Sequence, residues 1–230
     1  MMEIVEIKNK GYTNYLKGIK LIVFDMDGVL LKNRNSWDVI IRKSLGMHSN
    51  DRNSMKYTFD RLYKQGIPEY MFENLDATRI KTYLNLNELS SNVKLTMDYL
   101  KEKQIKTAIV SAGSHVFAEY LSEIFGFDYY IGNHVDTNAR KFIKNVDPEY
   151  KDINVRHIQE MYKIKANETL SVGDSYMDLS MKRSSKYFIA FNPSSNEMLE
   201  KSDFSVNSTN LFEIIETLVG GNLQLSYQGL

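Results

Sequence analysis

The sequence predicts an α/β fold, with a doubly wound parallel sheet and a helical segment inserted after its first strand. From about residue 90 onward, short apolar runs alternate with amphipathic stretches of helical length, which is typical of strand–helix units. An earlier apolar run over 19–24 predicts a buried strand that begins the sheet. Together these patterns predict a sheet covered by helices on both faces.

The expected elements follow from these patterns in chain order. Strands are predicted over 19–24, 105–110, 127–131, 169–172, 187–191 and 204–206. Helices are predicted over 90–104, 116–125, 154–163, 177–184, 195–201 and 210–219. Residues 32–88 are predicted to be mostly helical, because Trp37, Ile40, Ile41 and Leu45 recur at about the helical spacing.

The position of the helical block suggests how the chain is divided into domains. A core domain is expected over 19–31 and 89–220, and a helical cap domain over 32–88. The cap follows the first strand directly, so it is expected to lie beside the strand ends as a lid. Residues 1–18 are an N-terminal extension and residues 221–230 a tail.

Composition excludes several classes of protein. The 230 residues carry 29 basic and 29 acidic side chains, so no basic excess points to nucleic acid. There is no cysteine, which excludes disulfides and thiolate metal sites. No apolar run approaches the roughly 20 residues that span a bilayer, and we expect no membrane partner and a cytoplasmic location.

Two aspartates stand where the first strand ends. Asp25 and Asp27 follow the apolar run and precede Gly28, which permits a sharp turn out of the strand. Open α/β sheets place ligands at the carboxyl ends of their strands. Two carboxylates this close repel each other unless a cation or a shared proton intervenes. The pair therefore suggests a metal site, a proton-transfer pair, or both, although a polar strand end that caps the next element is the alternative.

Polar residues also follow two later strands. Ser111 and Ala112 come after the 105–110 run, where a hydroxyl and backbone N–H groups could hold an anion. Asp174 follows the 169–172 run and could bind a hard cation, with Asp178 one helical turn later. Lys151 precedes the helix that leads to this strand and could neutralise charge. Helix caps and a solvated surface lysine are the structural alternatives for these residues.

The combination of these residues resembles the haloacid dehalogenase superfamily of phosphohydrolases, and within it the phosphoserine phosphatase group. Members of that group carry a helical cap after the first strand, and residues 127–143 resemble their hairpin flap. The spacing from Lys151 to Asp174 also fits. The motifs that carry the resemblance, over about residues 19–219, are Asp25, Asp27, Gly28, Ser111, Lys151, Asp174 and Asp178.

The resemblance implies a Mg²⁺-dependent phosphatase that forms an aspartyl-phosphate. Mg²⁺ is expected on the carboxylates of Asp25 and Asp174 and on the backbone carbonyl of Asp27. Asp25 would attack phosphorus, and Asp27 would protonate the leaving group and later activate water. The pKa of Asp27 is therefore expected to be raised relative to that of Asp25.

The phosphate of the substrate is expected to be held by Ser111, a backbone N–H near Ala112, and Lys151. Asp178 and Gly28 would support this arrangement. An aspartate two residues after the nucleophile also favours phosphate over haloacid chemistry, because the dehalogenases of the superfamily lack this second acid.

The substrate is expected to be a small phosphorylated metabolite, without a commitment to phosphoserine. Phosphoserine phosphatases usually carry an acid just after the first motif, whereas this chain has Lys32 and Arg34, with Trp37 nearby. Arg34 and Trp37 are therefore candidate specificity residues, and the alternative is that Lys32 and Arg34 lie on an exposed hinge. A phosphotransferase or phosphomutase, a phospho-receiver module and a catalytically silent interaction protein are the alternative functions.

Overall fold

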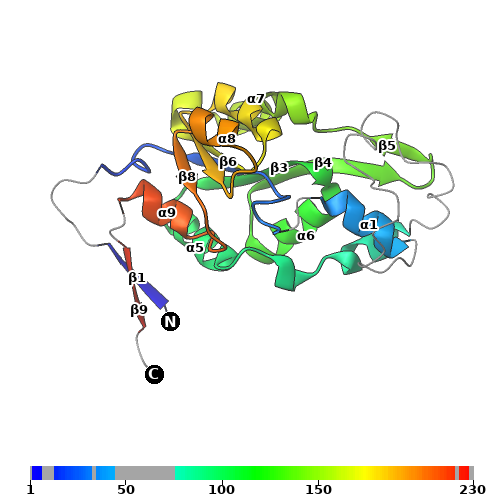
Figure 1. The fold of residues 1–230 in the computed structure, drawn as a ribbon, viewed down its shortest axis with the longest axis horizontal. Coiled ribbons are helices and arrows are strands. Elements are labelled where there is room, and N and C mark those ends of the chain that lie inside the picture. Colours follow the sequence, from blue (N-terminus) through cyan, green and yellow to red (C-terminus); the bar gives the residue numbers. More distant parts are fainter. Residues whose placement is uncertain (1, 7–12, 33–34, 45–75, 221–222, 228–230) are drawn as a thin grey trace.

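A seven-stranded sheet forms the centre of the chain in a computed structural model (Figure 1). The structure describes residues 2–6, 13–32, 35–44, 76–220 and 223–227. The strand order is β5-β4-β3-β2-β6-β7-β8, and every neighbouring pair is parallel except β4 and β5. The strands are β2 (Leu21–Phe24), β3 (Lys106–Ser114), β4 (Tyr129–Asp136), β5 (Lys141–Ile143), β6 (Thr169–Gly173), β7 (Tyr187–Phe191) and β8 (Phe204–Val206). The predicted doubly wound parallel sheet is confirmed.

Helices cover both faces of this sheet (Figure 1). One face carries α5 (Val93–Glu102), α6 (His115–Phe125) and α9 (Glu213–Leu218). The other carries α7 (Lys151–Tyr162), the 3₁₀ helix η5 (Tyr176–Ser184) and α8 (Asn196–Lys201). Two short 3₁₀ turns, η3 (Pro148–Tyr150) and η4 (Ala166–Glu168), precede α7 and β6.

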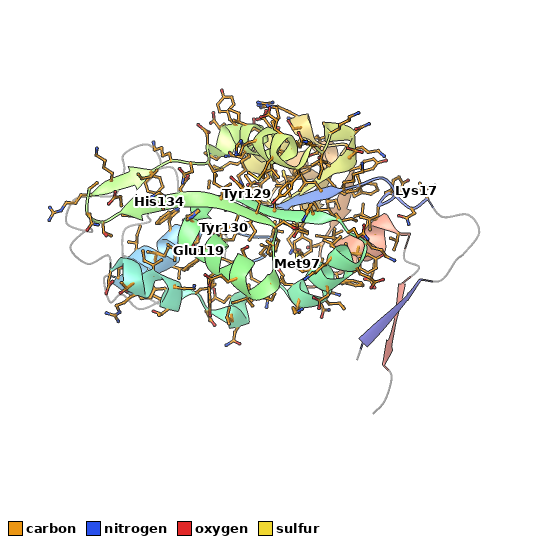
Figure 2. All side chains as sticks on the ribbon, turned by 180° about the vertical axis from the view of Figure 1, so that it is seen from behind. Lys17, Met97, Glu119, Tyr129, Tyr130 and His134 are labelled. Atoms are coloured by element: carbon orange, nitrogen blue, oxygen red, sulfur yellow. The ribbon has the colours of Figure 1, made fainter. Side chains whose placement is uncertain are left out.

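The central strand β2 divides its side chains between two hydrophobic cores. Ile22 and Phe24 pack with α5, α6 and α9, whereas Leu21 and Val23 pack with α7, η5 and α8. This alternation is what a strand with both faces covered requires. Tyr129 and Tyr130 of β4 divide in the same way, and Figure 2 shows Tyr130 beside Glu119 of α6, to which its hydroxyl donates a hydrogen bond.

Some element boundaries differ from the sequence prediction. The strand predicted over 105–110 runs to Ser114 as β3, because an irregularity in its pairing with β4 carries it past Val110. The helix expected over 154–163 begins earlier, at Lys151, and the segment predicted as an α-helix over 177–184 is a 3₁₀ helix. The predicted hairpin is present as the antiparallel pair β4 and β5.

The region of the predicted cap is described at its two ends. It contains α1 (Ser36–Ser44), α4 (Ala77–Ile80) and the 3₁₀ turns η1 (Lys81–Tyr83) and η2 (Leu86–Glu88). Residues 33–34 and 45–75, including the helix expected near 54–65, lie outside the described residues. The outgoing and returning connections run side by side, since Leu31 and Leu89 form an antiparallel bridge and the Lys32 N–H donates to the Glu88 carbonyl.

The two ends of the chain pair with each other. β1 (Met2–Glu6) and β9 (Leu223–Tyr227) form a two-stranded antiparallel sheet, which Figure 1 shows apart from the main one. Before β2, the Tyr15 N–H donates to the Leu218 carbonyl, and Leu16 is buried. The segment just before the core thus packs against the end of α9. No helix in the described part of the chain is long and apolar enough to cross a membrane.

Candidate active site

The carboxyl ends of three parallel strands surround one crevice. Asp25 and Asp27 follow β2, Ser111 and Ala112 lie in the last part of β3, and the turn after β6 contributes Asp174. These five residues and Lys151 line a cavity of about 210 Å³. The structure therefore brings together the six residues expected to act on a metal, on the phosphate or in catalysis, as the strand-end argument requires. The cavity is completed by Asn35, Gly113, Pro148, Ser175, Met177 and Ser194.

Asp25 is a buried carboxylate paired with a buried lysine. Its backbone N–H donates to the Val172 carbonyl at 2.9 Å, which extends the β2–β6 ladder by one residue. Its Oδ1 accepts a hydrogen bond from Lys151 Nζ at 2.8 Å. Burial raises the pKa of Asp25 to about 7, and Asp178 adds to the rise, whereas Lys151 opposes it.

Lys151 is the first residue of α7 and bridges two acids. Its Nζ lies 2.8 Å from Asp25 Oδ1 and 2.5 Å from Asp178 Oδ1, and all three side chains are at least 95% buried. Burial lowers the pKa of Lys151, but Asp178 and Asp25 outweigh this and raise it, so the side chain is an ammonium. The alternative of a solvated surface lysine is therefore wrong.

Asp178 holds this lysine and closes the turn after β6. Its Oδ2 accepts hydrogen bonds from the backbone N–H groups of Asp174 and Ser175, at 3.1 and 2.9 Å, and from the Ser175 hydroxyl. Gly173 makes this possible, because a Cβ there would lie 2.2 Å from the Cβ of Asp178.

Asp27 projects from a tight turn that follows β2. The Met26 carbonyl accepts hydrogen bonds from the N–H groups of Leu30 and Leu31, which turns the chain sharply. Asp27 Oδ2 accepts from the Ser36 N–H at 2.9 Å and from the Ser36 hydroxyl at 2.8 Å. Its Oδ1 is buried and accepts no hydrogen bond from any residue that the structure describes.

The pKa of Asp27 is not raised relative to that of Asp25, as the sequence led us to expect, because both values are raised. Burial raises the pKa of Asp27 to about 6, and the hydrogen bonds from Ser36 limit the rise. Burial also raises the pKa of Asp25, to about 7, and the nearby Asp178 adds to this rise. A bound dication would stabilise the ionised form of a carboxylate ligand and so lower the pKa of Asp25.

The donor set fits a hard divalent cation. Carboxylate oxygens of Asp25, Asp174 and Asp178 lie within 4.8 Å of one another. Asp178 is the least suited of the three, because Lys151 and two backbone N–H groups already occupy its oxygens. Asp25 and Asp174 remain, and all-oxygen ligation is what Mg²⁺ and Ca²⁺ prefer.

Gly28 makes room for Asp174. Its φ is +88°, and a Cβ at this position would lie 2.4 Å from Asp174 Cγ. Gly18 has a similar φ of +82° but has no atom within 4 Å of the same position. The two glycines therefore share a backbone conformation and differ only in their surroundings.

We expect Gly28→Ala to destabilise the protein more than Gly18→Ala. Both changes place alanine in the left-handed region, at about 1–2 kcal/mol each. Only Gly28→Ala also forces the Asp174 carboxyl group to move, which adds about 1–3 kcal/mol. Urea unfolding of the two variants measures the difference, and equal losses of unfolding free energy would contradict this packing argument.

Ser111 and Ala112 lie in the last part of β3, where hydrogen bonds support them. Ser111 Oγ accepts from the Gly113 N–H at 3.1 Å, which leaves its hydroxyl hydrogen available to a ligand. The Ala112 carbonyl accepts from Trp37 Nε1 at 3.2 Å and from Asn133 Nδ2 at 3.0 Å. The cavity lining thus rests on two buried side chains beneath it.

Of the two candidate specificity residues, the structure describes only Trp37. Arg34 lies outside the described residues. Trp37 is only 2% exposed, packs edge-to-face on Phe142 and does not line the cavity, so its contacts support Ala112. Large buried aromatic side chains serve packing, and this one also places its N–H on a partner.

Several residues that contact the site were not predicted from the sequence. Ser36, Asn133 and Ser194 contact the site from segments with no motif: Ser36 holds Asp27, Asn133 holds Ala112, and the Ser194 N–H donates to the Asp174 carbonyl. The only local signal for Ser36 was its place next to Asn35 at the start of a helix, a common capping pattern.

The fold and the site place the chain among doubly wound α/β proteins with a carboxylate-rich crevice at the strand ends. The family of haloacid dehalogenase-like hydrolases matches residues 19–185, well over half of the chain. The chain belongs to this family.

Individual relatives are more distant. The chain is 25% identical over 222 residues to a phosphoserine phosphatase of Archaeoglobus fulgidus, an alignment that covers 93% of this chain and 64% of that protein. It is 22% identical over 206 residues to a phosphoserine phosphatase of Methanocaldococcus jannaschii, covering 86% of this chain and 96% of the relative. A solved phosphoserine phosphatase in its apo form has a TM-score of 0.69 at 21% identity, covering 86% of this chain and 98% of the other. The last similarity shows the fold.

Proposed function

We propose that this chain is a Mg²⁺-dependent phosphomonoesterase that acts on a small phosphorylated metabolite, with Asp25 as the nucleophile. The observation that carries the proposal is the pair of buried salt bridges from Lys151 to Asp25 and Asp178, at the carboxyl ends of three strands. Burying three charges is costly, and structural ion pairs of this kind are often no more stable than apolar replacements. Several buried charged side chains that line one cavity are typical of a catalytic site.

Asp25 and Asp174 would hold Mg²⁺ through their carboxylates, together with the backbone carbonyl of Asp27. The cation would supply positive charge beside the phosphate and reduce the repulsion between the acids.

Each of four side chains would have a separate role in the reaction. Asp25 would attack phosphorus, so that an oxygen–phosphorus bond forms on Asp25 while the bond to the leaving oxygen breaks. Asp27 would donate a proton to that oxygen, then take one from the water that releases inorganic phosphate and regenerates Asp25. Lys151 and the Ser111 hydroxyl would hold the non-bridging oxygens of the phosphate.

The size of the cavity and the names of the relatives support a small phosphorylated metabolite as the substrate class. A cavity of about 210 Å³ suits a small metabolite. Relatives named phosphoserine phosphatase make phosphoserine one candidate, and the basic residue Arg34 favours testing substrates with a second anionic group as well. We also propose residues 32–88 as a cap, which the adjacent connections at Leu31 and Leu89 support.

The direct test is phosphate release from 4-nitrophenyl phosphate with added Mg²⁺. We expect release to stop with a chelator and to resume when Mg²⁺ is restored. We also expect Mg²⁺ to raise the melting temperature of the wild type and not of Asp174→Asn, because a ligand that binds only the folded state stabilises it. Transfer of phosphate to an added alcohol without free phosphate would identify a transferase, and no turnover in Mg²⁺ would contradict the proposal.

A further inference from the structure

Ser36 connects three separate parts of the candidate site. It is the first residue of α1, the helix that follows the turn after β2, and it is only 1% exposed. Its backbone N–H and its hydroxyl both contact Asp27, and its hydroxyl oxygen also contacts the N–H of Ser114 at the end of β3. It has no place among the residues proposed to hold metal or phosphate.

The direction of each hydrogen bond around Ser36 follows from counting hydrogens. The Ser114 N–H can only donate, so Ser36 Oγ must accept this bond, whose length is 3.0 Å. A hydroxyl has one hydrogen, and the remaining partner of Ser36 Oγ is Asp27 Oδ2 at 2.8 Å. The Ser36 hydroxyl therefore donates to Asp27 Oδ2.

The number of hydrogen-bond donors distinguishes the two carboxylate oxygens of Asp27. Oδ2 receives two donors, the Ser36 N–H and the Ser36 hydroxyl. A proton placed on Oδ2 would compete with these donors for the same lone pairs. Oδ1 has no hydrogen-bond partner among the described residues, and Asp27 lines the cavity. A protonated Asp27 would accordingly carry its proton on Oδ1.

The surroundings of Ser36 leave little room for another arrangement. A Cβ on Gly113 would lie 2.5 Å from Ser36 Oγ and 2.6 Å from Asp27 Oδ2. The absence of a side chain at Gly113 is therefore what lets Ser36, Asp27 and the end of β3 meet.

We propose that Ser36 is a positioning residue that holds Asp27 so that Oδ1 donates the proton to the leaving oxygen. This inference rests on the proposed phosphatase function. In the first step the Asp25–phosphorus bond forms, the bond from phosphorus to the leaving oxygen breaks, and that oxygen takes the proton from Asp27 Oδ1. Ser36 touches none of these reacting atoms and acts through Asp27 alone.

The test compares two aryl phosphates of similar shape whose leaving groups differ in their need for a proton. Phenolate is a strong enough base to need protonation as it leaves, whereas 4-nitrophenolate leaves without it. We expect Ser36→Ala to lower kcat/KM for phenyl phosphate at least about tenfold, and for 4-nitrophenyl phosphate less than about threefold. kcat/KM is the right quantity because it reports on the steps up to departure of the leaving group.

Three further variants separate positioning from general damage. Ser36→Thr keeps a hydroxyl and should restore the wild-type ratio of the two kcat/KM values. In an Asp27→Asn background, Ser36→Ala should cause no further loss, because the group it positions is already gone. Ser122→Ala, which removes another buried hydroxyl that donates to the Phe127 carbonyl, should leave the ratio unchanged. Ser36→Cys, which keeps the volume with a weaker donor, replaces Ser36→Ala if that variant does not fold.

The outcomes distinguish this inference from the proposed function. Equal losses on both substrates, no loss on either, or additive losses in the Asp27→Asn background would overturn the role of Ser36 and leave the phosphatase intact. A wild type that hydrolyses 4-nitrophenyl phosphate and not phenyl phosphate would also overturn it. A wild type inactive on both substrates with Mg²⁺ would overturn the proposed function itself.

Discussion

Asp25→Asn is expected to abolish phosphate release while leaving the folded protein at least as stable as the wild type. Loss of the nucleophile should lower kcat for 4-nitrophenyl phosphate by at least about 10⁴-fold, as removal of other enzymatic nucleophiles does. The protein should remain folded, because an amide of the same shape fills the same space beside Lys151. Residual hydrolysis within tenfold of the wild type would rule out Asp25 as the nucleophile.

The effect of Asp25→Asn on stability depends on pH in a defined direction. Folding raises the pKa of Asp25 from its usual 3.8 to about 7, so the folded protein binds this proton more tightly than the unfolded chain does. The contribution of Asp25 to the unfolding free energy therefore falls as pH rises from about 4 to about 7 and stays low above that.

Asparagine does not titrate, so the difference between the variant and the wild type should grow over the same pH range. Urea unfolding at pH 5 and pH 8, with a chelator present, measures this difference. A variant clearly less stable than the wild type at pH 8 would show that the Lys151 contact outweighs the cost of burying Asp25.

Lys151→Met is expected to abolish activity and also to destabilise the fold. The lysine is the shared partner of Asp25 and Asp178, and its removal leaves two buried carboxylates close together. Breaking a buried ion pair from one side costs about 3–5 kcal/mol, because the remaining charge is uncompensated. Burial and the nearby Asp178 raise the pKa of Asp25, so protonation of Asp25 at low pH relieves part of this cost. The loss should therefore be larger at pH 8 than at pH 5.

Lys94→Met is the matched control for this variant. Lys94 pairs with Asp98 one turn along α5, and both side chains are more than half exposed. Removing such a surface pair costs about 0.5 kcal/mol or less. Urea unfolding of the two variants should therefore differ by several kcal/mol. Similar small losses would mean that the buried bridge contributes little to folding.

Opposite effects of Asp25→Asn and Lys151→Met on stability would distinguish a catalytic cluster from a structural one. Both should be inactive, but only the lysine variant should unfold more readily. Groups that are costly to keep in the folded state are typical of active sites, where function is retained at the expense of stability.

Much of the site could be predicted because its residues carry local signals. Asp25, Ser111 and Asp174 each follow an apolar run, and the ends of parallel strands meet at one edge of a sheet whatever the loops between them. The alternation of strands and helices predicted the sheet in the same way. The ends of β3 and β4 were predicted least well, because both strands run on beyond the predicted residues. β3 continues through an irregular pairing with β4, and β4 continues into the hairpin with β5.

The sequence by itself determined the fold class, the family and the set of chemically competent residues, beginning with the pair Asp25 and Asp27. Only the tertiary structure decided how these groups are held. Ser36 meets Ser114 across 78 residues, and Lys151 meets Asp25 across 126. Such contacts leave no periodic pattern in the chain, because they depend on where whole elements pack. The tertiary structure thus showed that the Trp37 N–H supports Ala112 in the cavity wall. It also showed that Ser36 binds one oxygen of Asp27, while the other has no partner among the described residues.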